Sequence, residues 1–382
     1  MQFSDVLGQH EIKTYLREIV SQDRVPHALL FLGKPGNGPL PMALAFAQYL
    51  MCEKRGQDDA CGDCTHCKKN RKYIHPDIHY TYPTIGSKMT SADFTSSWRS
   101  FLEANPYGDA FDWFNMLGGD NKQGNITKDE CNRILKVLSL KTFEGEYKIH
   151  ILWMPEYLGA QGNRLLKIIE EPPDSTVFIL VAERQEEILN TILSRCQIVS
   201  FKPLKDEVIA KQLTDQFEFN HTKSMQIAFL TDGDLNEALK LAGEKDQVLS
   251  TLWIDWMRKV YKGYGPDLVA WSDQLNRMDR ESQKNLFRYG LHFLHEMLIY
   301  ELNNHYTPRL LDKEKMAMQK LGALMSISKI EAMIELINLS IFHIERNANS
   351  KIIMLDCGIK IHRILRKGEV NRKRKSDANY QN

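Results

Sequence analysis

Residues 27–40 read HALLFLGKPGNGPL, an apolar run that passes directly into a glycine-rich turn. The run from 27 to 32 is short and ends at the turn, which predicts a buried strand. A helical pattern resumes with MALAFA at 42–47. A strand, a glycine turn and a helix in direct succession indicate the first unit of an α/β fold.

Two further apolar runs predict strands of the same sheet, IHILW at 149–153 and VFILV at 177–181. Between them, residues 163–171 predict a helix. The pair Pro172-Pro173 stops this helix, because proline lacks a backbone N–H and clashes with the preceding turn. Alternating strands and helices predict an α/β domain with a mainly parallel sheet, covered by helices on both faces.

After Pro203 the pattern becomes almost wholly helical, with no convincing strand. The aromatic-rich stretch from Phe94 to Asn125 is broken by Asn, Gly and Asp, and we interpret it as an insertion. We expect an α/β domain at residues 1–203, with a cysteine module near 52–67. A small helical domain at 204–245 and a larger helical domain at 246–365 should follow, and residues 366–382 should form a basic, disordered tail.

The composition is that of a soluble protein with more than one domain: 382 residues, 43% hydrophobic and 26% charged. The net charge of +1 argues against nucleic-acid binding over the whole surface. We expect a cytoplasmic protein, because no long apolar run and no signal-peptide pattern is present. The end of the chain is either a solvated tail or a weak phosphate-contacting arm, with basic residues Arg366, Lys367, Arg372, Lys373, Arg374 and Lys375.

The glycine turn has the frame of a phosphate-binding loop without its working residues. The motif G-x-x-x-x-G-K-[ST] needs a lysine for the terminal phosphates and a hydroxyl for magnesium. Here Gly33 and Gly38 keep the frame, with Gly36 between them, but Pro39 and Leu40 replace the lysine and the hydroxyl. Pro39 also removes a backbone N–H at a helix start, where an anion would dock. The loop alone is also compatible with a glycine turn unrelated to any NTPase.

A second nucleotide-handling position is also apolar. A magnesium-supporting Asp should end the 149–153 strand, but Trp153 and Met154 stand there and the nearby acid is Glu156, after Pro155. We therefore expect no tight ATP binding and no catalysis by this chain alone.

Four of the seven cysteines form a compact module, C-x8-C-x2-C-x2-C, made of Cys52, Cys61, Cys64 and Cys67. Four thiolates satisfy tetrahedral zinc and leave no open position, which predicts a structural Zn²⁺ site. His66 lies inside the module and could replace one ligand. An iron–sulfur cluster and reduced, unliganded thiols are the alternatives, although the usual iron–sulfur runs have other spacings.

These features together resemble the bacterial DNA polymerase III clamp-loader AAA+ subunits. The resemblance is dense over residues 1–203 and thin afterwards. It rests on the degenerate loop, the cysteine module and the segments RVPHALLF at 24–31, NRLLK at 163–167, EEPP at 170–173, TILSRC at 191–196 and NANSK at 347–351. The TILSRC segment looks like the SRC motif of this family.

Within that family, degenerate Walker motifs beside a retained SRC motif resemble the delta-prime type. Asn236 takes the place of the expected sensor-2 arginine, and Ala182-Glu183-Arg184 lacks the usual sensor-1 Thr. The resemblance implies an AAA+ domain followed by a helical lid and a helical collar. It also implies a ring with gamma/tau-like and delta-like subunits that loads a sliding clamp on primed DNA, in which Arg195 serves as an arginine finger for a neighbouring ATP site.

Two rival functions stay open from the sequence. One is an active, gamma/tau-like AAA+ ATPase, against which Leu40 and Trp153 argue. The other is a zinc-containing nucleic-acid-binding module, which the near-neutral charge and the lack of a basic helix beside the cysteines oppose.

Overall fold

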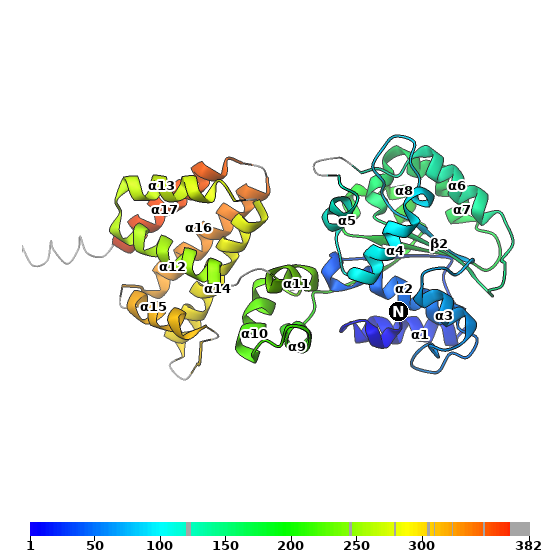
Figure 1. The fold of residues 1–382 in the computed structure, drawn as a ribbon, viewed down its shortest axis with the longest axis horizontal. Coiled ribbons are helices and arrows are strands. Elements are labelled where there is room, and N and C mark those ends of the chain that lie inside the picture. Colours follow the sequence, from blue (N-terminus) through cyan, green and yellow to red (C-terminus); the bar gives the residue numbers. More distant parts are fainter. Residues whose placement is uncertain are drawn as a thin grey trace, which may run out of the picture. The chain divides into compact units, whose positions relative to one another are not determined.

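The structure is a computed structural model, and it describes residues 1–366 apart from 120–123, 244–246, 279, 304–305, 309, 323 and 347. The chain divides into two compact units. The first contains Met1–Ile209 together with Asp232–Glu237, and the second contains Ala210–Thr231 and the chain from Ala238 onward (Figure 1). Each unit is described by itself below.

The first unit is built on a five-stranded sheet in the order β2-β3-β4-β1-β5. All four strand pairs are parallel. The strands are β1 (Ala28–Leu32), β2 (Ile78–Thr81), β3 (Lys148–Trp153), β4 (Thr176–Ala182) and β5 (Gln197–Ser200). This confirms the predicted α/β class with its parallel sheet.

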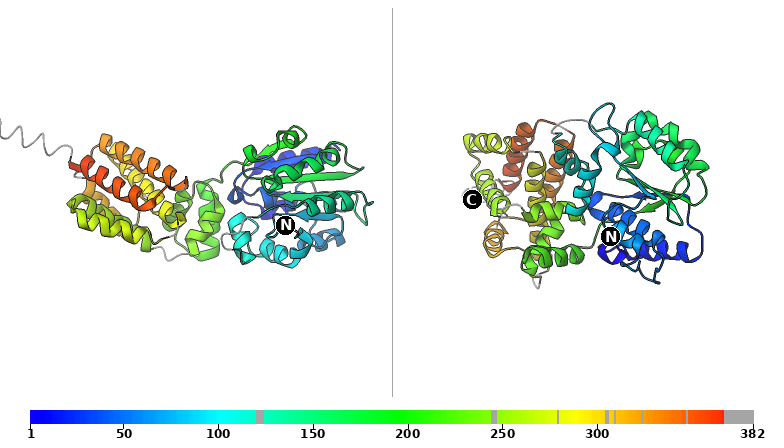
Figure 2. Two further views of the ribbon diagram at one scale, coloured as in Figure 1. Left: turned by 90° about the horizontal axis from the view of Figure 1, so that it is seen from above. Right: turned by 45° about the vertical axis from the view of Figure 1, so that its right-hand side comes forward.

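Helices cover both faces of this sheet (Figure 2). Successive strand side chains point to opposite faces. Leu29 and Phe31 of β1 therefore belong to one buried cluster, with α2, while Ala28 and Leu30 belong to another, with α6. The α-helices of the unit are α1 (His10–Ser21), α2 (Pro39–Met51), α3 (Thr65–Arg71), α4 (Thr95–Ala104), α5 (Ala110–Met116), α6 (Lys128–Leu138), α7 (Leu166–Glu170) and α8 (Asn190–Leu193). Short 3₁₀ helices are η1 (Phe3–Asp5), η2 (Pro35–Asn37), η3 (Ser91–Phe94), η4 (Pro155–Leu165) and η5 (Gln185–Glu187).

The three predicted strands are confirmed as β1, β3 and β4, whereas β2 and β5 were not predicted. Both are four-residue strands with polar residues, IHYT and QIVS, so neither carries a continuous apolar run. The helix predicted at 163–171 is in part 3₁₀: η4 runs to Leu165, and only α7 is α-helical before the two prolines.

The stretch from 94 to 125 that we interpreted as an insertion packs into the core. Its residues Trp98, Phe101 and Trp113 are buried, and their rings contact one another at centroid distances of 5.4–5.5 Å. Trp153 at the end of β3 lies 5.1 Å from the ring of Trp98. The described part of this stretch is thus integral to the first unit, and residues 120–123 lie outside the described residues.

The second unit is helical throughout the residues that the structure describes. From residue 206 onward the helices are α9 (Asp206–Phe217), α10 (His221–Leu230), α11 (Leu235–Gly243), α12 (Gln247–Lys262), α13 (Gly265–Leu275), α14 (Arg280–Leu302), α15 (Asp312–Gly322), α16 (Ile327–Glu345) and α17 (Ser350–Arg366). A core with three buried tryptophans, Trp253, Trp256 and Trp271, joins α12, α13, α14, α16 and α17. The boundaries at 204–245 and 246–365 stay a prediction, and the tail from 367 to 382 lies outside the described residues.

None of the helices among the described residues combines the length and the apolar character needed to span a bilayer.

Candidate functional site

The degenerate loop lies between a strand and a helix, as a phosphate-binding loop does. It follows β1, forms the 3₁₀ turn η2, and ends at Gly38, whose φ of 91° favours glycine. Pro39 then begins α2, where its fixed φ suits the first helical turn. Leu40 is only 2% exposed, and every residue of α2 is buried. The position that would hold magnesium is thus part of the apolar core.

Other residues of the chain already occupy the space over this loop. A Cβ placed on Gly36 would lie 1.8 Å from Oδ1 of Asp234 and 2.7 Å from the backbone nitrogen of Leu235. A Cβ on Gly38 would lie 3.1 Å from the ring of Tyr107. Asp234, Leu235 and Tyr107 thus pack closely against the glycines of the loop.

Buried acids lie near the loop. Burial raises the pKa of Asp234 to about 6, and the hydrogen bond from the Glu237 backbone and the charge of Lys34 oppose this rise. Burial also raises the pKa of Glu183, and the charge of Arg184 opposes this rise. At pH 7 the Asp234 carboxylate is largely ionised, and its charge opposes the approach of a polyanion.

Asn236 fixes the segment that contains Asp234 and Leu235. It is 2% exposed, and its side-chain oxygen accepts a hydrogen bond of 2.7 Å from Nδ2 of Asn105. Its Nδ2 donates to Oδ2 of Asp112 at 2.8 Å and to Oδ2 of Asp109 at 3.3 Å. Where the resemblance expects a sensor-2 arginine, the structure has a buried amide that ties the start of α11 to the 105–112 segment.

The residues after β3 stand where a magnesium-supporting acid was expected from the sequence. Trp153 is buried among aromatic rings, and Met154 adopts a positive φ of 56°. Oε1 of Glu156 accepts hydrogen bonds from the backbone nitrogens of Glu183 and Arg184 at 2.6 and 2.8 Å. This carboxylate therefore fixes the turn after β4, and burial raises its pKa.

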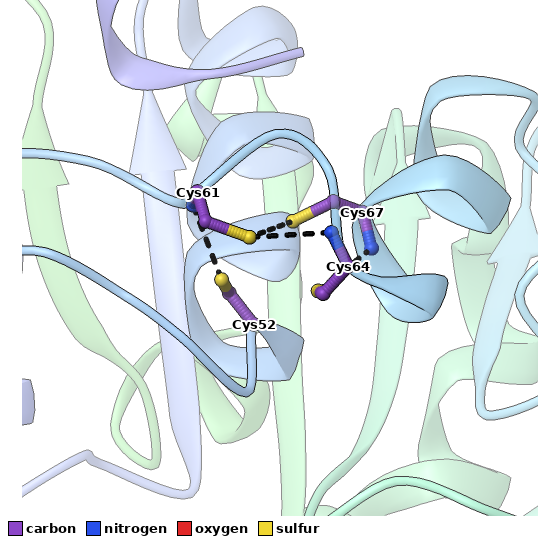
Figure 3. A group of neighbouring side chains, drawn as sticks. All are labelled: Cys52, Cys61, Cys64 and Cys67. Carbon is purple, nitrogen blue, oxygen red and sulfur yellow. Dashed lines mark hydrogen bonds between the residues drawn. The ribbon is translucent and has the colours of Figure 1, made fainter.

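The four cysteines of the module converge, as Figure 3 shows. Their four Sγ atoms lie within 4.8 Å of one another, and the Sγ atoms of Cys61 and Cys67 are 3.9 Å apart. Tetrahedral Zn–S bonds of about 2.3 Å place sulfurs about 3.8 Å apart, so the donor set fits zinc. Cys52 follows the end of α2, and Cys64 is the N-cap of α3.

Backbone N–H groups point at these sulfurs. The nitrogen of Cys61 donates to Sγ of Cys52 at 3.2 Å, and that of Cys64 donates to Sγ of Cys61 at 3.3 Å. Hydrogen bonds from the backbone of Asp63 and Cys64 lower the pKa of Cys61 to about 6. Such bonds stabilise thiolates, which are the form that binds metal.

His66 turns away from the cysteines toward a second buried histidine. Its Nδ1 lies 2.6 Å from Nε2 of His75, and its Nε2 lies 3.0 Å from Oε1 of Glu53. The backbone nitrogen of Asp77 donates to Nδ1 of His75 at 3.1 Å. Burial lowers the pKa of His75 to about 4, so this ring is neutral at pH 7 and carries its hydrogen on Nε2.

The hydrogen-bond direction follows from this tautomer. Nε2 of His75 donates to Nδ1 of His66, and Nε2 of His66 donates to the Glu53 carboxylate. Although His66, His75 and Glu144 lie close enough to share an ion, neither ring then offers a lone pair to one. The geometry thus favours the four cysteines alone as the ligand set.

Arg195 lies between α8 and β5, far in sequence from the loop. Its side chain is 29% exposed and is paired with the Glu170 carboxylate at 2.7 Å. The backbone nitrogen of Arg195 donates to the carbonyl of Ile192, which fixes the turn that carries it. The structure thus places Arg195 on the surface of the first unit and leaves its proposed catalytic role to experiment.

The parallel sheet, the glycine turn between β1 and α2 and the helices that follow define a P-loop-type fold of the AAA+ class. Residues 8–205 match the family model described as DNA polymerase III, delta subunit. Because this match spans slightly more than half of the 382 residues, the chain belongs to that family.

The chain is also similar to individual proteins. DNA polymerase III subunit delta' of Bacillus subtilis is 27% identical over 235 residues, which are 61% of this chain and 59% of the relative. The subunit tau of the same organism is 28% identical over 254 residues, 65% of this chain and 38% of the relative. A gamma subunit-related protein of Thermotoga maritima has a solved structure with 14% identity and a TM-score of 0.38, covering 92% of this chain and 99% of that one. This chain thus spans about three fifths of the length of the delta' relative and about two fifths of the length of the tau relative.

Proposed function

We propose that this chain is a non-hydrolysing, delta-prime-like subunit of a DNA polymerase III clamp loader in the cytoplasm. It assembles with gamma/tau-like and delta-like subunits and helps them load the sliding clamp on primed DNA. It supplies Arg195 to the ATP site of a neighbouring subunit. Its helical part serves as a lid at 204–245 and a collar at 246–365, and Cys52, Cys61, Cys64 and Cys67 hold one structural Zn²⁺.

The observation that carries this proposal is the state of the glycine-rich loop at 33–40, which lacks its working residues and has other side chains packed against it. An ATPase site needs an open phosphate cradle, a lysine and magnesium ligands. Here Pro39 and Leu40 replace two of these groups, and Asp234 and Tyr107 stand over the backbone of the loop. The family match supports a role in the replication machinery, and the partly exposed side chain of Arg195 supports a contribution in trans.

The isolated chain should show no saturable binding of Mg-ATP tighter than about 1 mM, because the loop lacks the phosphate-binding lysine and Asp234 packs against its backbone. Isothermal titration calorimetry measures this directly, with a gamma/tau-type subunit as the positive control. Micromolar affinity with magnesium-dependent turnover in the purified chain would overturn the non-hydrolysing assignment and favour an active ATPase.

To test assembly, the chain is mixed with gamma/tau-type and delta-type subunits, and the mass of the resulting complex is measured by native mass spectrometry. The expected product is a hetero-oligomer that contains one copy of this chain. A chain that stays alone but binds DNA with a steep salt dependence would instead support a nucleic-acid-binding module.

A further inference from the structure

The side chain of Arg195 is held in one orientation by its own chain. Nε and Nη2 both donate to Oε2 of Glu170, at 2.9 and 2.7 Å. Nη1 donates to the carbonyl of Thr191 at 2.8 Å and lies 3.4 Å from Oγ of Ser194. Contacts on two edges of a planar group fix the direction in which its third edge points.

The remaining donor capacity lies on the terminal edge of the guanidinium. Nε carries one hydrogen and each Nη carries two. The contacts with Glu170, Thr191 and Ser194 account for four of these five hydrogens, which leaves one N–H on Nη2 without a recorded partner in the part of the chain that the structure describes. This N–H belongs to the edge shared by Nη1 and Nη2, which is the edge that can address the oxygens of a phosphoryl group.

The pair contributes little to folding. The side chain of Glu170 is 54% exposed and that of Arg195 is 29% exposed, and exposed ion pairs add little to stability. Both partners nevertheless come from fixed positions: Glu170 is the last residue of α7, and Arg195 follows the short helix α8. The ion pair between Glu170 and Arg195 thus has a definite geometry but contributes little to stability. Such a pair is suited to orienting the arginine side chain.

We propose that Glu170 is a positioning residue for Arg195, which holds the arginine so that its terminal edge is presented to the ATP site of a neighbouring subunit. This inference rests on the proposed function. Pre-orientation matters because a catalytic group that has already lost its rotational freedom acts at a lower cost in the transition state. Glu170 itself touches no reacting atom.

The test uses complexes reconstituted with gamma/tau-type and delta-type subunits, and compares Glu170→Ala with Glu171→Ala. Glu171 is the adjacent exposed acid, so both variants change the charge by the same amount. Among the residues that the structure describes, no hydrogen bond or ion pair joins Glu171 to Arg195. An Arg195→Ala complex defines how much ATPase activity depends on the arginine. Glu170→Gln, whose amide oxygen can still accept a hydrogen bond, is the conservative variant.

Glu170→Ala should remove more than half of the Arg195-dependent activity, by lowering kcat with little change in the KM for ATP. Glu171→Ala should be neutral, and Glu170→Gln should fall between Glu170→Ala and the unchanged protein. Unchanged or increased turnover in an assembled Glu170→Ala complex would overturn the positioning role. If Arg195→Ala itself leaves turnover unchanged, the proposed function fails first, so the two failures are distinguishable.

Discussion

Cys64→Ser should reduce the bound zinc from one ion per chain to nearly none and unfold the segment from 52 to 70. Serine is a good N-cap, so the start of α3 keeps its capping group while the thiolate ligand is lost. The remaining three sulfurs leave an incomplete site, and ligand binding and folding are coupled in such a small module. Metal analysis of reduced protein and hydrogen exchange over 52–70 measure the two effects.

His66→Gln is the matched control for this experiment. The histidine lies inside the module, but its ring nitrogens face His75 and Glu53. We therefore expect one zinc per chain in this variant, with at most a modest loss of stability from the disturbed hydrogen bonds. Iron in the unchanged protein, no metal at all, or loss of the metal in His66→Gln would contradict the four-cysteine zinc site.

Arg195→Ala should leave the fold and the assembly of the chain intact and slow ATP turnover at one site of the complex. An arginine finger neutralises charge on the transferred phosphoryl group and contributes about 10³- to 10⁵-fold at the site it serves. The loss in the whole complex should be partial, because other subunits complete the remaining sites. ATP binding should change little, since the arginine acts mainly on charge in the transition state.

Arg195→Lys should restore little of this activity, because an ammonium group lacks the planar guanidinium geometry that pairs with Glu170 and directs the remaining N–H. Steady-state ATPase and clamp-loading rates of correctly assembled complexes measure both variants. Equal rates in the Arg195→Ala complex and the unchanged complex would leave the chain with a scaffolding role alone.

The sequence predicted those features that depend on neighbouring residues. The strands β1, β3 and β4 are apolar runs, and the loss of the phosphate-loop lysine and hydroxyl can be seen at Pro39 and Leu40. The cysteine module is equally local, because its four ligands lie within 16 residues of one another. Such patterns carry their own physical signal and need no tertiary context.

The parts that could not be predicted arise from contacts between distant segments. Tyr107 and Asp234 cover a loop that lies about 70 and 200 residues away in the chain. The tautomer of His66 depends on His75 and on the backbone of Asp77. The aromatic residues between 94 and 125 were the available signal for a buried segment, but their partners Tyr82 and Trp153 could not be identified without the sheet.

The most direct measurement is the DNA-stimulated ATPase rate of the partner subunits as the purified chain is titrated into them, with the clamp present. We predict no turnover by the chain alone, a rate that rises to a plateau at the stoichiometry of the complex, and a lower plateau with Arg195→Ala. Turnover by the chain alone, or identical plateaus for the unchanged and Arg195→Ala chains, would contradict a non-hydrolysing subunit that acts in trans.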